Sequence, residues 1–159
     1  MILLTVGTCP HQFDRLVRAV DVAVGDGIID DEIFAQTGAC NYKPVNMQYS
    51  EMLAKTEFDE YFAKASCIIG HAGMGTISMS LDAGKPLLVM ARMAKYKEHV
   101  NDHQVSTAKM FEAMGHILVA WAEEEIPGKV AELRSFKPQK REATPGLVAD
   151  RIGAYLNTL

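Results

Sequence analysis

A short glycine-rich segment near the middle of the chain carries the side chains best suited to chemistry. Residues His71 to Thr76 read HAGMGT, and they follow the mostly apolar run from Ser66 to Gly70. This order predicts a strand, a tight turn and a helix, which places backbone N–H groups and a hydroxyl at the positive end of the helix. Such a helix start suits the phosphates of a nucleotide. A capped turn with a purely structural role is the alternative, because a glycine-rich turn alone is a weak signal.

The side chains of this segment offer specific contacts to an anionic ligand. Gly73 and Gly75 let the backbone turn tightly and let a ligand approach it closely. Thr76 is expected at the N-cap or in the first helical turn, where it offers both its hydroxyl and its amide. His71 can donate to a phosphate oxygen, although a histidine that ends a buried strand often bonds only to a neighbouring loop.

Two further loops are expected to meet this segment, because ligands of an open parallel sheet collect at the carboxyl ends of its strands. One loop follows the N-terminal strand and starts with Gly7 and Thr8. The other leads into Asp102, His103 and Gln104 at the start of a helix. These three polar side chains can present donors and acceptors to the hydroxyls of a sugar, while Asn101 or Asp102 can instead cap an exposed first turn.

The same polar stretch also contains a pattern of possible metal ligands. His99 and His103 are four residues apart, as are Glu98 and Asp102, and a continuous helix would present each pair on one face. The helix is expected to start near Asn101 or Asp102, however, which would turn His99 away from His103. Because no further cluster of ligands is evident in the sequence, no metal is expected.

The elements that position these loops alternate between short β-branched runs and longer helical segments, a pattern typical of a parallel sheet covered by helices on both faces. The predicted fold class is therefore α/β, with a Rossmann-like parallel sheet. Residues 42–50 are interpreted as a connection. Strands are expected over residues 2–6, 32–37, 66–70, 87–90 and 117–120, and helices over residues 13–24, 51–65, 76–83, 102–114, 123–133 and 146–156.

The composition is that of an ordinary globular chain of 159 residues, which is enough for one domain with a real core. Its 48% apolar content excludes extended disorder, and its net charge of −4 argues against a nucleic-acid partner, which would demand a basic excess.

Cys9, Cys40 and Cys67 are odd in number and widely spaced, so they predict a reducing cytosol rather than a disulfide framework. The apolar N-terminus lacks the basic lead of a signal peptide and reaches Gly7 too soon to span a membrane.

Several motifs occur together and in order along the chain. They are Gly7-Thr8, Phe13-Asp14-Arg15-Leu16, Gln36-x-Gly38, His71-Ala72-Gly73-x-Gly75-Thr76, Gly84-Lys85-Pro86 and Asn101-Asp102-His103-Gln104. From Met1 to about Gly115 the chain thereby resembles the C-terminal domain of family 28 glycosyltransferases. It is most similar to the stand-alone form, the soluble subunit of two-subunit transferases in bacterial exopolysaccharide synthesis and in dolichol-linked N-acetylglucosamine transfer.

The resemblance implies the C-terminal half of a GT-B enzyme, so that residues 1–159 form a single nucleotide-sugar-binding domain. Many family members carry a glutamate for the ribose hydroxyls eight residues after the histidine, and this chain has Met79 there. The implied contacts to the donor phosphates are Gly7, Thr8, His71, Gly73, Gly75 and Thr76, with His71 as the catalytic residue. The implied contacts to the donor sugar are Asp102, His103 and Gln104.

The implied activity is inverting transfer of a hexose from a UDP-sugar to a lipid-linked polyprenyl diphosphate acceptor, in polysaccharide or glycolipid synthesis and without a metal or other cofactor. The resemblance also implies a membrane-anchored partner subunit that supplies the N-terminal GT-B half and is needed for activity. The chain itself is then cytoplasmic and reaches the membrane face through this partner. Two other hypotheses stay open at this point. One is a non-catalytic nucleotide-binding regulatory subunit, and the other is a metal-dependent hydrolase built on His99, Asp102 and His103.

Overall fold

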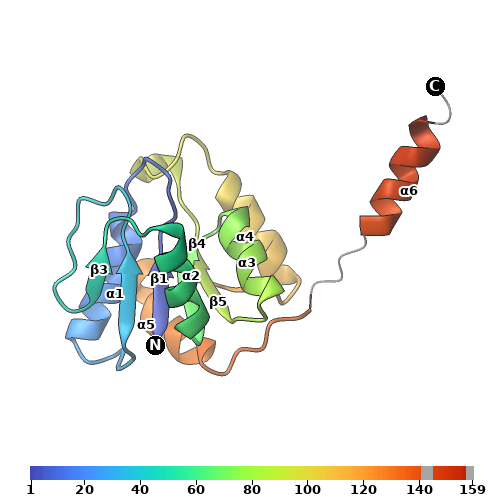
Figure 1. Ribbon diagram of the computed structural model, residues 1–159. Coiled ribbons are helices and arrows are strands. Elements are labelled where there is room, and N and C mark those ends of the chain that lie inside the picture. The colour runs from blue at the N-terminus through green and yellow to red at the C-terminus, as the bar shows by residue number, and fades with distance from the viewer. Residues whose placement is uncertain (141–144, 157–159) are drawn as a thin grey trace.

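Six parallel strands form one sheet in the order β3-β2-β1-β4-β5-β6 in the computed structural model, which describes residues 1–140 and 145–156 (Figure 1). The strands are β1 (Ile2–Thr5), β2 (Ile33–Gln36), β3 (Gln48–Ser50), β4 (Cys67–His71), β5 (Leu87–Met90) and β6 (Leu118–Val119). The α-helices are α1 (Asp14–Gly25), α2 (Lys55–Lys64), α3 (Met74–Asp82), α4 (His103–Ala113), α5 (Ile126–Leu133) and α6 (Pro145–Leu156). Two short 3-10 helices, η1 (Ala94–Tyr96) and η2 (Glu123–Glu125), lie in the loops after β5 and β6.

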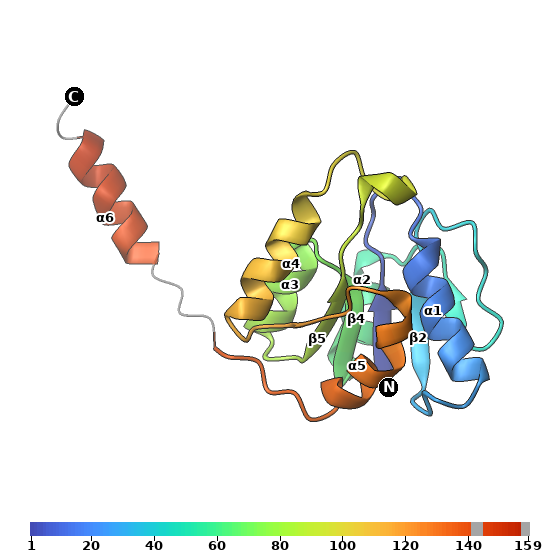
Figure 2. The ribbon, with the colours of Figure 1, turned by 180° about the vertical axis from the view of Figure 1, so that it is seen from behind.

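Helices cover both faces of the sheet, because the central strands are apolar on both faces. The helices α2, α3 and α4 lie on one face (Figure 1), and α1 and α5 lie on the other (Figure 2). Side chains alternate along each strand, so that Leu3 and Ile68 pack toward the first group of helices while Leu4 and Ile69 pack toward the second. The predicted α/β architecture is therefore confirmed.

The order of the strands reverses direction at β1. The chain passes from β1 outward to β2 and β3, and then returns to β4 on the other side of β1, where Thr5 is paired with Gln36 on one side and with Gly70 on the other. The loops after β1 and β4 consequently lead to helices on opposite faces, α1 and α3. A crevice opens at such a switch point, at the carboxyl ends of the strands.

Several elements differ from the sequence predictions in their presence or bounds. The predicted connection 42–50 contains the edge strand β3, which pairs with β2 through Phe34 and Gln48. Helix α2 begins at Lys55 rather than at residue 51, because the Glu57 carboxylate accepts a hydrogen bond from the Ala54 N–H at 3.0 Å and caps the helix there. Helix α3 begins two residues earlier than predicted, with Gly73 at the N-cap.

The C-terminal helix was predicted over residues 146–156, and α6 is found over Pro145–Leu156. Within residues 1–140 and 145–156, no helix combines the length and the apolar character needed to cross a bilayer.

Candidate functional site

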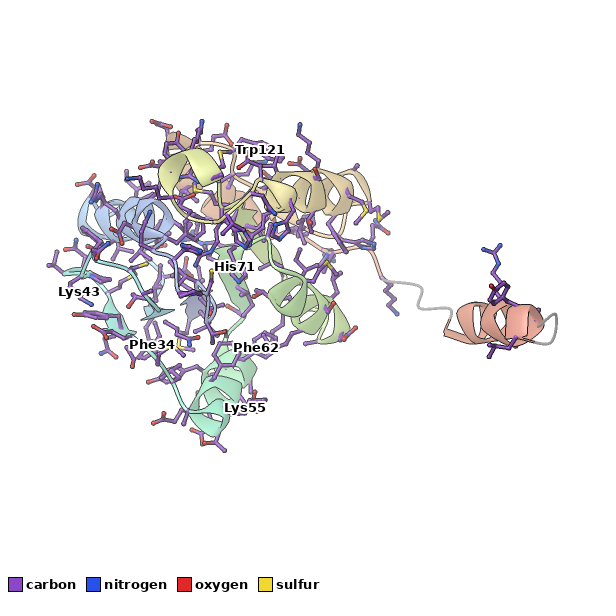
Figure 3. The ribbon with its side chains drawn as sticks, turned by 90° about the horizontal axis from the view of Figure 1, so that it is seen from above. Phe34, Lys43, Lys55, Phe62, His71 and Trp121 are labelled. Carbon is purple, nitrogen blue, oxygen red and sulfur yellow. The ribbon has the colours of Figure 1, made fainter. Side chains whose placement is uncertain are left out.

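A cavity of about 740 Å³ lies at the switch point, at the carboxyl ends of β1, β2 and β4. Figure 3 views the molecule from this end, with His71 near the centre and Lys55 on the protruding α2 helix. The volume lies within the range of ordinary ligand pockets. Six of the predicted site residues line it, namely Gly7, Thr8, His71, Gly75, Thr76 and Gln104.

The imidazole of His71 is held in a slot between two glycines. A Cβ atom on Gly73 would lie 2.1 Å from His71 Cε1, and a Cβ atom on Gly7 would lie 2.6 Å from His71 Nε2. Gly7 also has a positive φ of 73°, a conformation that favours glycine. The two glycines of the predicted loops are therefore required by the close approach of the histidine ring, which places the β1–α1 loop and the start of α3 on either side of it.

Gln104 connects the histidine to the loop that follows β5. Its side chain is 3% exposed, and its Oε1 accepts a hydrogen bond from the Arg92 backbone N–H at 3.3 Å. Its Nε2 lies 3.2 Å from His71 Nδ1. Both ends of the amide are thus engaged inside the protein, although Gln104 also lines the cavity.

The pKa of His71 is lowered from 6.5 to about 4, and burial is the largest cause. The positive charge of Arg92 and the nearby His99 contribute to this lowering, while the contact with Gln104 opposes it. The imidazole is therefore neutral at physiological pH, and it carries one N–H donor and one acceptor.

Arg92 fixes the two loops that border the cavity from the side of β5. Its buried guanidinium donates to the carbonyl oxygens of Val6, His11 and Gln12, which lie in or next to the β1–α1 loop, at 2.8 to 3.0 Å. It also donates to the carbonyl oxygen of Glu98 at 3.1 Å, in the loop between β5 and α4. This one side chain therefore ties the two loops together.

An ion pair reinforces this connection. The Glu98 carboxylate is fully buried, and both of its oxygens accept hydrogen bonds from the Arg15 guanidinium at 3.0 Å. Arg15 also donates to the Ala91 carbonyl oxygen at 3.0 Å. With Arg92 close by, the cluster holds two positive charges and one negative charge, so it carries a net positive charge behind the cavity.

The opposite wall of the cavity comes from residues that carry no recognisable motif. Leu53, Phe58 and Met79 form an apolar surface between α2 and α3. Lys55 lies at the start of α2, and its Nζ is paired with Asp59 at 2.5 Å at the protein surface. The sequence predictions missed Leu53, Lys55 and Phe58, because only their position in the folded chain distinguishes them.

Three of the predicted site residues do not line the cavity. Gly73 lies behind the His71 ring. Asp102 is exposed, and its carboxylate accepts a hydrogen bond from the Ala94 N–H at 2.7 Å. His103 is also exposed, and its Nδ1 contacts the Asn101 side-chain oxygen.

The histidines near the cavity mouth lie closer together than predicted. The rings of His99 and His103 meet edge to face with their centroids 4.5 Å apart, and His99 itself lines the cavity. The expectation that His99 turns away from His103 was wrong, because Lys97 adopts a left-handed conformation with φ 58° and redirects the chain. In the part of the chain that the structure describes, no group of three or more His, Cys, Asp or Glu side chains is arranged to hold a metal ion.

Residues 1–150 match the glycosyltransferase family 28 C-terminal domain. The chain belongs to this family. Among curated proteins, this family 28 chain is 35% identical over 63 residues to the human UDP-N-acetylglucosamine transferase subunit ALG13. That alignment covers 40% of the chain and only 5% of the human protein.

Solved structures confirm the fold of this family 28 chain. The kitacinnamycin glycotransferase superposes with a TM-score of 0.60 at 20% identity over 96% of this chain and 37% of that one. MurG of Acinetobacter baumannii superposes with a TM-score of 0.53 at 18% identity over 85% of this chain and 42% of that one. The chain thus spans well under half of either structure, and it has the Rossmann-like fold of the C-terminal half of a GT-B enzyme.

Proposed function

We propose that the chain is the donor-binding catalytic subunit of an inverting glycosyltransferase that uses a UDP-sugar and a lipid-linked diphosphate acceptor. The observation that carries this proposal is the cavity at the β1–β4 switch point, which joins His71 and the start of α3 to an apolar wall. A nucleoside diphosphate needs this combination, because its phosphates are anionic and the flat faces of its base stack on apolar side chains. Membership in a glycosyltransferase family supports sugar transfer as the reaction.

The phosphates of the donor fit the end of the cavity formed by the start of α3. Backbone N–H groups in the first turn of a helix have no partner within the helix, and they favour an anion. Gly75 and Thr76 belong to this turn and line the cavity. His71 adds a neutral donor, and the net positive cluster of Arg15, Arg92 and Glu98 adds a favourable field.

The nucleobase fits the apolar wall at the other end of the cavity. Leu53 lies there in the segment before α2, Phe58 on α2 and Met79 on α3. Met79 has no polar group that can bond a ribose hydroxyl. We therefore assign the ribose contacts to Thr8 and Lys55, which line the same cavity.

The chemical demand on this site is to stabilise the leaving group. Departure of UDP leaves growing negative charge on the diphosphate, and preorganised N–H donors stabilise that charge without reorganising during the reaction. His71 and the amides of the α3 start would do this without a metal ion. The base that deprotonates the acceptor hydroxyl is assigned to the partner.

A membrane-anchored partner subunit would supply the acceptor site and the other GT-B half. The human relative is named as a subunit of a UDP-N-acetylglucosamine transferase, and the solved transferases are more than twice as long as the part that this chain matches. The proposed complex acts at the cytoplasmic membrane face. The chain would reach that surface through its partner.

Calorimetric titration of the purified chain with UDP and with a panel of UDP-sugars tests the donor site. The matched variants are His71→Ala and His116→Ala, because His116 does not line the cavity and its ring Nδ1 contacts the Gln139 carbonyl oxygen at 2.8 Å. We expect binding that survives EDTA, that is unchanged in His116→Ala and that weakens at least about tenfold in His71→Ala.

The same titration with the co-expressed partner separates a donor site that the partner completes from a wrong proposal. Absence of UDP binding in both preparations would refute the donor site. Equal rates of sugar transfer by wild type and His71→Ala complexes would instead show that the chain binds the nucleotide without taking part in catalysis.

A further inference from the structure

Gln104 lies between His71 and the backbone of Arg92 at the end of β5. We infer that Gln104 is a positioning residue that holds His71 in the tautomer protonated at Nε2, so that the imidazole presents its N–H to the donor diphosphate. The inference rests on the proposed function only for the identity of that anion. The orientation of the ring proton follows from the protein itself.

The orientation of the Gln104 amide is determined by its neighbour on β5. The Arg92 backbone N–H can only donate, and it lies 3.3 Å from one end of the amide. That end must therefore be the carbonyl oxygen Oε1. The other end is consequently the NH₂ group, which lies 3.2 Å from His71 Nδ1.

The NH₂ group of Gln104 then determines where the imidazole carries its proton. An NH₂ group offers donors only, so His71 Nδ1 must accept and can carry no hydrogen. A neutral imidazole has one proton, which is then on Nε2. Because burial keeps His71 neutral, the ring has a single donor with a fixed direction.

The Nε2 atom is the ring nitrogen that lies against Gly7 of the β1–α1 loop. A Cβ atom on Gly7 would lie 2.6 Å from Nε2, so the absence of a side chain at Gly7 lets this edge of the ring approach the loop that borders the cavity. Gly7 and His71 both line the cavity. The opposite tautomer would present a lone pair to the phosphates, and two acceptors would then face each other.

Nitrogen-15 NMR of the imidazole tests the inference on the chain alone and without any ligand, because the two tautomers differ in their ring nitrogen shifts. In the wild type we expect a single species with the proton on Nε2. A proton on Nδ1 would overturn the inference. This measurement needs no variant, and its result does not depend on whether the chain binds a nucleotide.

The variant Gln104→Glu replaces the NH₂ donor beside His71 Nδ1 with a carboxylate oxygen, which can only accept a hydrogen bond. We expect Nδ1 to gain a proton in this variant, whereas retention of a bare Nδ1 would overturn the inference. Gln104→Met is the second variant. It removes the hydrogen bond without a new charge, and we expect both tautomers to be present. The control is Gln48→Glu, which makes the same chemical change at an exposed position on β3.

Titration with UDP and with UDP-N-acetylglucosamine distinguishes positioning from direct sugar contact. Positioning predicts that Gln104→Met, which adds no charge beside the anion, weakens UDP binding by about two- to tenfold, because part of the His71 population then presents a lone pair to the diphosphate. A sugar contact alone would leave UDP binding unchanged and weaken only the sugar nucleotide, which would overturn the inference. Failure of the wild type to bind either nucleotide would refute the proposed function, while the NMR result would still decide the tautomer.

Discussion

The slot that holds His71 makes two neighbouring glycines respond in opposite ways to the same substitution. Gly73 is the N-cap of α3, and Gly75 lies in the first turn of the same helix. A Cβ atom on Gly73 would lie 2.1 Å from His71 Cε1, whereas a Cβ atom on Gly75 meets no neighbouring atom within 4 Å. Gly73→Ala is therefore expected to disturb the imidazole, and Gly75→Ala is expected to leave it in place.

The magnitude of the effect follows from this geometry. Ordinary contacts begin near 3.4 Å, so the ring in Gly73→Ala must move by more than 1 Å, and Gly7 blocks the opposite side of the slot. Overpacking of this kind costs about 1–3 kcal/mol, and it includes loss of the hydrogen bond to Gln104. Gly75→Ala is instead expected to stabilise by about 0.5–1 kcal/mol, because alanine favours the helix.

Urea unfolding followed by circular dichroism measures both changes. Gly73 occupies the N-cap with φ −86° and ψ 138°, which alanine tolerates, but alanine is also the poorer cap. Gly73→Ser separates the two causes, because serine restores the cap and keeps the Cβ atom. We expect Gly73→Ser to remain destabilised by more than about 1 kcal/mol. Wild-type stability in Gly73→Ser would refute the steric reasoning and assign the whole effect to the cap.

Three other predictions follow from the buried charges and from His71, each measured by denaturant unfolding. Arg92→Met should cost about 3 kcal/mol, because four carbonyl oxygens lose their donor. Glu98→Gln should also cost about 3 kcal/mol, whereas Asp59→Asn, at an exposed ion pair, should cost less than about 0.5 kcal/mol. The pKa of His71 is about 4 in the folded chain and about 6.5 in the unfolded one, so between these pH values the unfolded chain binds one more proton. The free energy of unfolding should therefore fall by about 3 kcal/mol as the pH drops from 6.5 to 4. His71→Asn should remove that part of the pH dependence.

The central strands could be predicted from the sequence because they are buried on both faces and read as short apolar runs. The edge strand β3 could not, because Gln48 and Tyr49 are exposed and only pairing with β2 keeps this segment extended. The start of α2 depends on the contact between Glu57 and Ala54. The sequence permits several such local caps, so it does not determine at which residue α2 begins.

Gly7 and Gly73 have a steric reason in the folded chain, since a Cβ atom on either would overlap the His71 ring, whereas a Cβ atom on Gly75 meets no atom within 4 Å. The sequence did not show which of the adjacent polar residues Asp102, His103 and Gln104 would be buried beside the site. Each helical residue points about 100° away from the last, so Gln104 is buried while Asp102 and His103 are exposed. The outcome depends on the exact start of α4. The apolar wall carries no motif at all, because Leu53 and Phe58 become part of the site only through the packing of α2 on the sheet.

Arg92 combines two separable roles at the end of β5. Its side chain holds the β1–α1 loop against the loop that follows β5, and its backbone N–H orients Gln104. The first role depends on the guanidinium, while the second is present with any residue except proline at this position. The stability of the two loops and the tautomer of His71 are therefore controlled by different atoms of one residue. The positive charge of Arg92, which holds the two loops, also disfavours protonation of His71. The same arginine therefore helps to keep His71 a neutral donor.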